Sequence, residues 1–312
     1  MEQTAPAHSR HAPRGRPRLG RPRLLIIGCG DIGGRILARL ASRFRVVALT
    51  SSPSRVPQLR AAGAVPIVGD LDRRRSLRRL SGLRLRVIHL APPPESGGRR
   101  DPRTRALLAA LRRRPDRLVY VGTTGVYGDR RGGLVDETTP PAPANERAWR
   151  RLDAEDAVRA ARGSVLRAPG IYAHDRLPLA RLRGGVPALA PEDDVYSNHI
   201  HADDLARLCI AALFRGGRAR VYNAVDRSQL KMGEYFDLVA DRCGLPRPPR
   251  LPRAQLRERV TPMMYSFMSE SRRIRGERIG RELRLRLAWP TVAQALAASR
   301  ALPVPGTAHG QG

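Results

Sequence analysis

The chain has 312 residues, of which 41% are hydrophobic, and this is enough to bury a core in one large domain or in one domain with a smaller appendage. The three cysteines form no Cys-x-x-Cys pair, so the composition predicts neither a disulfide framework nor a metal site. No apolar run approaches the ~18 residues that a membrane span needs, and we expect a cytoplasmic protein with no membrane partner.

The formal net charge of +30 suggests a nucleic acid as a partner, because clustered cations neutralise phosphates. Of the 58 basic residues only Lys231 is a lysine, and the arginines are spread over every segment. This distribution indicates a coding bias toward arginine, and no zinc-finger, basic-zipper or aromatic RNA-binding motif accompanies it. We therefore expect no specific nucleic-acid partner, although polyanions should bind nonspecifically at low salt.

Residues 1–22 are rich in Arg, Pro, Gly and His, and they are predicted to form a disordered basic lead. A mitochondrial transit peptide is the alternative, but the prolines disfavour an amphipathic helix there. From residue 23 to residue 167, short apolar β-branched runs alternate with longer helical patterns, which is typical of βαβ units and a parallel sheet. The predicted strands are 24–28, 45–50, 65–69, 87–90, 118–122 and 164–167, and the predicted helices are 32–40, 104–111 and 146–160.

After Pro169 the pattern changes to loops with a few elements. These are a helix at 202–214, a strand at 221–223, a helix at 232–243 and a Pro-rich linker at 246–252. We therefore predict an α/β fold in which a doubly wound parallel sheet carries a small C-terminal α+β subdomain on the substrate side. The predicted divisions are a sheet domain at 23–170, a mixed region at 171–302 that completes the sheet, and a disordered tail at 303–312.

A glycine-rich turn directly follows the first predicted strand and opens an amphipathic helix; its residues are Gly28, Cys29, Gly30, Asp31, Ile32 and Gly33. Gly28 permits the tight turn, Gly30 lets the backbone approach a pyrophosphate, and Gly33 lets the helix pack closely on the strand. The helix N-terminus offers N–H groups to the anion. The turn predicts a Rossmann-type dinucleotide site, with an ordinary βα turn as the alternative.

Asp31 lies close to the expected phosphate, and Arg35, one helical turn later, would offset its charge. The second strand is followed by Ser51, Ser52 and Arg55 and carries no carboxylate of the kind that binds the ribose hydroxyls of NAD. Hydroxyls with an arginine suit a 2′-phosphate, so we predict NADP as the cofactor, with NAD possible. A merely solvated Arg55 is the alternative.

The third strand is followed by Asp70 and Leu71, which are predicted cofactor neighbours. The Asp70 carboxylate would meet the adenine amino group, or alternatively cap the next helix.

Six stretches between residues 24 and 289 together resemble the extended and atypical short-chain dehydrogenase/reductases, a group often labelled NAD-dependent epimerase/dehydratase. They are 28–33, 69–71, 89–92, 121–128, 166–172 and 198–205. The resemblance implies that Ala91, Pro169 and Ile171 lie beside the cofactor or the substrate. It also implies that the stretch 201–205 is mainly structural and fixes the loop before a helix.

The chemistry of that family uses a tyrosine and, four residues later, a lysine that lowers the pKa of the phenol. Alignment on Glu155, which resembles the family's helix glutamate, puts Arg147 and Arg151 at these two places. Arginine keeps its proton in proteins, so Arg147 cannot replace the phenol as an acid or base. The chain therefore resembles the atypical branch of the family.

Thr123 takes the place of the family's Ser or Thr, and we predict it as a catalytic residue that hydrogen-bonds the reacting oxygen. Four side chains expected near the cleft are candidates for a substitute acid: Tyr127, Tyr172, His174 and His199. We predict Tyr127 as the second catalytic residue, although packing in its turn is the structural alternative. For Tyr172 and His199 the alternatives are a wall of the cleft and the ordering of a loop.

These features predict an NAD(P)-binding oxidoreductase or epimerase that acts on a small-molecule carbonyl or sugar-like substrate. The alternative is a non-catalytic NAD(P)-binding sensor or scaffold, in which Arg147 and Arg151 would clamp an anion. Segment 261–273 contains three methionines and two aromatic residues, which suits either an adaptable lid or plain packing. The arginines on the helices that pair many relatives leave the oligomeric state unpredicted.

Overall fold

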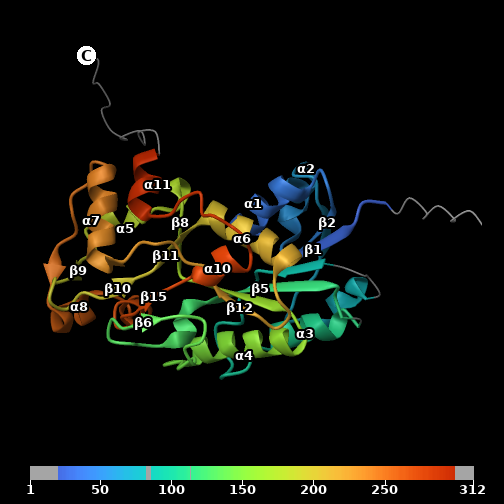
Figure 1. Ribbon diagram of the computed structural model, residues 1–312, viewed down its shortest axis with the longest axis horizontal. Coiled ribbons are helices and arrows are strands. Elements are labelled where there is room, and N and C mark those ends of the chain that lie inside the picture. Colours follow the sequence, from blue (N-terminus) through green and yellow to red (C-terminus); the bar gives the residue numbers. More distant parts are fainter. Residues whose placement is uncertain (1–19, 82–85, 113, 299–312) are drawn as a thin grey trace, which may run out of the picture.

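The computed structural model describes residues 20–81, 86–112 and 114–298. The centre of the fold is a seven-stranded parallel sheet with helices on both faces (Figure 1). Its strand order is β12-β7-β5-β4-β1-β2-β3. The strands are β1 (Arg23–Ile27), β2 (Arg45–Thr50), β3 (Val65–Val68), β4 (Arg86–His89), β5 (Arg117–Thr123), β7 (Ser164–Ala168) and β12 (Val221–Asn223).

The sheet separates two apolar cores because successive side chains of a strand point to opposite faces. Leu24 and Ile26 of β1 belong to one core, which is shared with α1 (Asp31–Leu40), α2 (Val56–Ala61) and α6 (Ala202–Arg215). Leu25 and Ile27 belong to the other core, on the side of η2 (Arg74–Leu80), α3 (Pro102–Ala110) and α4 (Glu146–Ala160). Figure 1 shows α1 and α6 above the sheet and α3 and α4 below it. Burial of both faces explains the nearly continuous apolar runs that identified the strands.

The C-terminal half adds four two-stranded pairs and a third apolar core. The pairs are β6 (Leu134–Val135) with β15 (Arg273–Ile274), β8 (Gly170–Tyr172) with β11 (His199–His201), β9 (Ala188–Leu189) with β14 (Arg250–Leu251), and β10 (Tyr196–Ser197) with β13 (Leu230–Lys231). The helices are α5 (Leu179–Arg183), α7 (Met232–Arg242), α8 (Arg253–Arg259), α9 (Pro262–Phe267), α10 (Glu277–Arg281) and α11 (Val292–Ala298). Short 3-10 helices are η1 (Pro53–Arg55), η3 (Thr124–Tyr127) and η4 (His174–Arg176). Helices α5, α7 and α11 pack together around Tyr172 and Phe236.

The predicted doubly wound parallel sheet is confirmed. The six strands predicted up to residue 167 are β1 to β5 and β7, and the predicted strand at 221–223 is β12. Helix α3 begins at Pro102, two residues before its predicted start, because Asp101 caps it by accepting hydrogen bonds from the backbone N–H groups of Arg103 and Thr104. The Pro-rich linker at 246–252 contains strand β14. Most of the predicted basic lead (1–22) and the whole predicted tail (303–312) lie outside the described residues.

The strand order reverses between β1 and β4, so the connections that leave these two strands run to opposite faces of the sheet. A crevice forms at the carboxyl edge of such a sheet, and open α/β sheets bind ligands there. Among the described helices, none is long and apolar enough to cross a membrane.

Candidate active site

The glycine turn joins β1 to α1 with the backbone geometry that the sequence predicts. Gly28 has φ +78°, and a Cβ on it would lie 2.7 Å from the backbone nitrogen of Ala91. A Cβ on Gly33 would lie 3.1 Å from Cys29 Sγ, so this glycine allows α1 to approach the strand. A Cβ on Gly30 would meet nothing within 4 Å, so the space in front of the first turn of α1 is open. Such a cradle fits a pyrophosphate, because the first N–H groups of a helix have no partner within it.

Beside this turn lies a cavity of ≈ 450 Å³ at the carboxyl ends of β1 to β4. It brings together seven of the predicted cofactor residues, which are Gly28, Gly30, Ser51, Arg55, Asp70, Leu71 and Ala91. No carboxylate follows β2 here, and the Arg55 guanidinium donates to Gln58 Oε1 at 3.4 Å. Asp70 also holds its own turn by accepting a hydrogen bond from the backbone N–H of Asp72 at 3.0 Å. The cavity therefore has the residues expected for the adenosine end of a dinucleotide.

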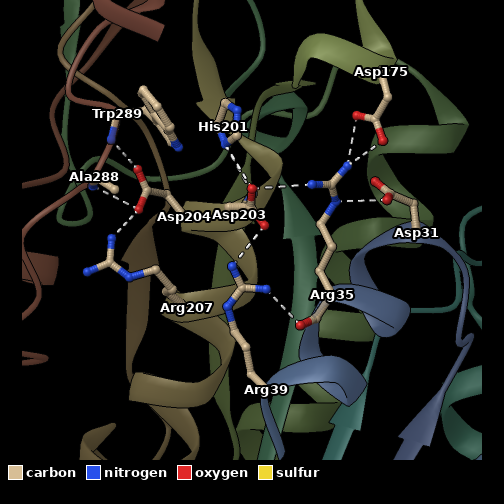
Figure 2. Close-up of polar contacts among 10 residues, drawn as sticks. All are labelled: Asp31, Arg35, Arg39, Asp175, His201, Asp203, Asp204, Arg207, Ala288 and Trp289. Atoms are coloured by element: carbon tan, nitrogen blue, oxygen red, sulfur yellow. Dashed lines mark hydrogen bonds and ion pairs between the residues drawn. The ribbon is translucent and has the colours of Figure 1, made fainter. Parts of the chain in front are cut away.

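Asp31 and Ile32 do not line this cavity. The Asp31 carboxylate accepts from Arg35 Nε at 2.8 Å and from Arg176 Nη1 at 2.9 Å, and it therefore faces η4 (Figure 2). Ile32 packs against the core that α1 shares with α6. The prediction of Asp31 and Ile32 as cofactor neighbours therefore rests on their backbone N–H groups, in the first turn of α1, because their side chains point away from the cavity.

Arg35 is the centre of the network that holds Asp31. Its guanidinium also contacts the Asp175 carboxylate at 2.8 Å and the Asp203 carboxylate at 3.3 Å. Figure 2 shows how these contacts connect α1, η4 and α6. The predicted charge compensation between Arg35 and Asp31 is present, but it joins elements of the fold and does not prepare a phosphate site.

A second cavity, of ≈ 760 Å³, lies at the carboxyl ends of β5 and β7. Thr123, Pro169 and Ile171 line it as predicted, together with Tyr172 and His199. The Thr123 hydroxyl accepts a hydrogen bond from the backbone N–H of Gly125 at 3.1 Å, and its own proton is left to donate. Because β4, which borders the first cavity, neighbours β5 in the sheet, the two cavities open on the same edge.

Tyr127 does not reach either cavity, and this corrects its prediction as a catalytic residue. The side chain is fully buried, its hydroxyl donates to Asn223 Oδ1 at 2.8 Å, and Arg167 lies over its ring. Burial raises the pKa of this phenol. The Val-Tyr-Gly turn directs Tyr127 inward, so this side chain packs in the interior, as the structural alternative expected.

Of the other candidate acids, His174 is exposed on η4 and does not line the second cavity. His199 is buried and stacks on Tyr235 with ring centroids 4.3 Å apart. Burial lowers the pKa of His199 to about 4, so its imidazole is neutral at pH 7. Tyr172 is 2% exposed, and burial together with the Asp226 carboxylate raises the pKa of its phenol. Both side chains therefore form the wall of the cavity.

The two arginines at the tyrosine and lysine places both line this second cavity. Arg147 lies over the Phe267 ring, 4.8 Å from its centroid. Burial and the neighbouring charges of Arg151 and Arg150 lower the pKa of Arg147. Arg151 reaches toward the strand ends, where its charge acts on buried His89 and Tyr120. Among the described side chains neither Arg147 nor Arg151 forms an ion pair, and the Glu95 carboxylate acts on Arg147 only through its charge.

A buried ion pair supports the cavity from below. Arg167 of β7 donates to the Glu155 carboxylate at 2.8 and 3.0 Å, and these side chains are 3% and 0% exposed. Arg150 is also buried, and it holds the loop after β4 by donating to the carbonyls of Glu95 and Gly98 at 2.5 Å. These contacts fix α4, and with it Arg147 and Arg151, relative to the sheet.

Several residues that line the second cavity were not predicted. Arg176, Tyr196, Tyr235 and Arg272 lie outside the six family-like stretches of the sequence. The methionines and aromatic residues of 261–273 were the one signal, and Met263 and Phe267 do line this cavity. Among the described residues, no group of three or more His, Cys, Asp or Glu side chains is placed to hold a metal ion.

The contacts of Asp204 fit the structural role that the resemblance implies for the stretch 201–205. Buried Asp204 accepts from the backbone N–H groups of Ala288 and Trp289 at 3.0 and 2.8 Å, and from Arg207 (Figure 2). Asp204 thereby attaches the segment before α11 to the N-terminus of α6.

Solved structures of the same fold include sugar-nucleotide enzymes. A functionally unknown conserved protein from Silicibacter pomeroyi is 31% identical, with a TM-score of 0.74 over 89% of this chain and 97% of that one. The UDP-glucose 4-epimerase of Thermotoga maritima is 16% identical, with a TM-score of 0.69 over 88% and 96%. A double mutant of the Streptomyces venezuelae dTDP-glucose 4,6-dehydratase, with NAD bound, is 20% identical, with a TM-score of 0.68 over 88% and 96%. The last two likenesses show the fold alone.

No curated protein matches the chain significantly. A model of the NAD(P)H-binding family matches residues 28–215, which begin at the glycine turn and end with α6. The comparisons agree with the resemblance to the short-chain dehydrogenase/reductases that the motifs indicate. Because the match spans more than half of the sequence and includes the open glycine cradle, the chain belongs to the NAD(P)H-binding family.

Proposed function

We propose that this protein is an NAD(P)-dependent oxidoreductase or epimerase that acts on a small-molecule carbonyl or sugar-like substrate. The observation that carries the proposal is the pair of cavities on one edge of the sheet, one beside the glycine turn and the other beside Thr123. A dinucleotide bound at the glycine turn would extend along this edge past the end of β4 toward the end of β5.

Within the second cavity, Thr123 would donate a hydrogen bond to the reacting oxygen of the substrate. Arg147 and Arg151 add positive charge beside it, which stabilises an oxygen that becomes negative during the reaction. When bound, the nicotinamide supplies or accepts a hydride. The two arginines cannot exchange protons at neutral pH, so their contribution is electrostatic.

We further propose NADP as the preferred cofactor and the cytoplasm as the compartment. Arg55 and Ser51 in the first cavity suit a 2′-phosphate, and no carboxylate follows β2 to repel it. The cysteines are free thiols, which is usual in a reducing compartment. The proposed partner is a small-molecule substrate, with no specific nucleic acid.

Titration of the purified chain with NADPH, followed by nicotinamide fluorescence, tests the cofactor site. Gly30→Val should abolish binding because its side chain would occupy the open cradle, while thermal melting shows that the variant is folded. Gly34→Ala is the matched control, because its Cβ also meets nothing within 4 Å and alanine favours a helix. Failure of the unchanged chain to bind either NADPH or NADH would refute the proposed function.

The cofactor preference has its own test. Arg55→Gln should weaken NADPH binding by about tenfold and leave NADH binding unchanged, because only NADPH carries the 2′-phosphate that Arg55 would bind. Arg60→Gln, on an exposed position of α2, is the control. Equal weakening of NADPH and NADH binding would argue against a 2′-phosphate site.

The second candidate function is a non-catalytic sensor or scaffold, which the arginine at the tyrosine place favours. A panel of aldehydes, ketones and oxo acids, each incubated with NADPH, separates the two candidates. NADPH binding without consumption of NADPH by any member of the panel would favour the sensor.

A further inference from the structure

The polar acceptors around the second cavity are mostly bound to other parts of the protein. Glu270 accepts from Arg272 Nη1 at 2.7 Å, and Glu146 lies 3.5 Å from Arg150 Nη1. Asn145 Oδ1 accepts from the backbone N–H of Ala148 at 2.9 Å and so caps α4. These acceptors are therefore partly occupied by donors of the protein, which lowers their capacity for the hydroxyl groups of a sugar.

The amide of Asn198 is used in the same way. Its oxygen accepts from the backbone N–H of Ile274, and its nitrogen donates to the carbonyl of Arg272, both at 2.9 Å. These bonds hold the wall of the cavity together across β11 and β15. Asn198 therefore keeps only one acceptor site of its oxygen and one N–H for a ligand.

The charged side chains of the second cavity that form no ion pair in the described ranges are arginines. Arg272 is paired with Glu270, and Arg176 with Asp31. Arg147 and Arg151 stand one helical turn apart on α4, and in the described ranges neither forms an ion pair, although the charge of Glu95 partly offsets that of Arg147. Their mutual repulsion contributes to the lowered pKa of Arg147. An anion between them would remove this repulsion.

The mouth of the cavity is apolar and exposed. Met263 and Phe267 of α9 are 64% and 52% exposed, and they are two of the six large hydrophobic side chains that the described surface exposes. Both line the cavity, and the Phe267 ring also packs against the Arg147 guanidinium. Further apolar or aromatic lining residues are Ile171, Tyr196, Met232, Tyr235 and Phe236. Exposed apolar side chains that gather at a cavity indicate an apolar ligand.

We propose that the substrate of this site is an amphiphilic anion, in which an apolar body carries one carboxylate or phosphate. Arg147 and Arg151 bind the anionic group by charge-assisted hydrogen bonds, and α9 covers the apolar body. This inference rests on the proposed function. Of the two substrate classes named there, it favours a carbonyl compound, here an apolar acid, over a sugar. The anionic group lies beside Thr123, so the reacting carbonyl is near the charged end of the molecule.

Isothermal titration of the full chain, with NADPH present, tests the inference with three probes that share one apolar body: octanoate, octyl phosphate and octanol. We expect at least one anion to bind at least about tenfold more tightly than octanol. The order of octanoate and octyl phosphate identifies the anionic group. Arg147→Met and Arg151→Met should each weaken binding of the preferred anion about tenfold or more and leave octanol binding unchanged. Arg147→Lys should restore part of the loss because it keeps the charge.

Arg159→Met is the matched control, because Arg159 lies on the same helix but contacts Asp156 and the Ala219 carbonyl outside the cavity. Equal binding of octanol and both anions would overturn the inference. Anion binding that neither cavity arginine affects would also overturn it, as would binding of UDP-glucose that is tighter than that of octanoate and octyl phosphate. Nicotinamide fluorescence separates this failure from that of the proposed function: a chain that binds NADPH but does not distinguish octanoate or octyl phosphate from octanol refutes this inference alone.

Discussion

Tyr127 and Asn223 share a hydrogen bond in the interior, next to the buried Arg167. Replacement of Tyr127 by phenylalanine would leave Asn223 Oδ1 without this donor. We expect Tyr127→Phe to lower the free energy of unfolding by about 1–3 kcal/mol and to leave NADPH affinity unchanged. Urea denaturation and nicotinamide fluorescence measure the two quantities. Loss of turnover in a variant of unchanged stability would restore Tyr127 as a catalytic candidate.

Glu155 and Arg167 form the most deeply buried ion pair described here, and removal of one partner leaves a charge without compensation. We expect Glu155→Gln to lower the free energy of unfolding by about 3–5 kcal/mol. Glu277→Gln breaks an exposed pair with Arg281 and should cost about 1 kcal/mol or less. Denaturant midpoints of both variants check the contrast, and similar losses in the two would show that burial of the pair does not matter.

Asp226 is a buried carboxyl group behind Tyr172, and burial raises its pKa to about 7. Because the folded chain favours the protonated form, Asp226 lowers stability increasingly as the pH rises from about 4 to about 7. His199 has the opposite effect, because its lowered pKa costs stability as the pH falls from about 6.5 to about 4. The two groups therefore oppose each other over the same range of pH.

The variant Asp226→Asn separates these contributions. Relative to the unchanged chain, its free energy of unfolding should rise by at most about 1.4 kcal/mol per pH unit between pH 4 and 7 and then stay level. Asparagine keeps the acceptor that the backbone N–H of Ser228 uses. Urea denaturation at several pH values measures the difference, and a constant difference across this range would mean that Asp226 is ionised throughout.

At the scale of elements, charged side chains join α1 to the start of α6. Arg35 is only 16% exposed and contacts three carboxylates, whereas Arg39 is 37% exposed and contacts Asp203 alone among them. Loss of Arg35 removes a contact from all three carboxylates and leaves Asp31 to Arg176 and Asp203 to Arg39, while loss of Arg39 affects Asp203 alone, which keeps its contact with Arg35. The network therefore depends mainly on Arg35.

We expect Arg35→Gln to lower the free energy of unfolding by about 1–3 kcal/mol and Arg39→Gln by about 1 kcal/mol or less. Added salt should reduce the loss in Arg35→Gln, because it screens the repulsion among the carboxylates. Thermal melting of both variants at low and high salt tests this. Equal shifts of the melting temperature would show that the network is not centred on Arg35.

At the scale of the whole molecule, a net charge of +30 is carried almost entirely by arginine. Most described carboxylates are already paired with arginines, so the excess positive charge remains on the surface. We expect DNA of any sequence to bind at low salt, with an affinity that falls linearly on a logarithmic salt scale. Fluorescence anisotropy with two unrelated duplexes measures this. A strong preference for one duplex at physiological salt would contradict the interpretation of the charge as coding bias.

Much of the fold was predictable because the signals are local. The apolar runs predict β1, β2, β4, β5 and β7, since a strand buried on both faces needs apolar residues in succession. The edge strand β3 is more exposed, and its β-branched residues predict it. The sequence also predicts the glycine turn, because the φ angle of Gly28 and the close approach at Gly33 depend on the adjoining strand and helix. The cofactor side of the site follows from strand ends that a parallel sheet must bring to one edge.

The sequence by itself therefore determined the fold, the family and the cofactor cradle. Only the tertiary structure decided which side chains face the substrate cavity, because those come from segments more than a hundred residues apart. It turned Tyr127 into the interior and Asp31 toward Arg176, and it placed α9 over Arg147. It also decided which of many arginines are left unpaired, since pairing depends on where each carboxylate lies in the folded chain.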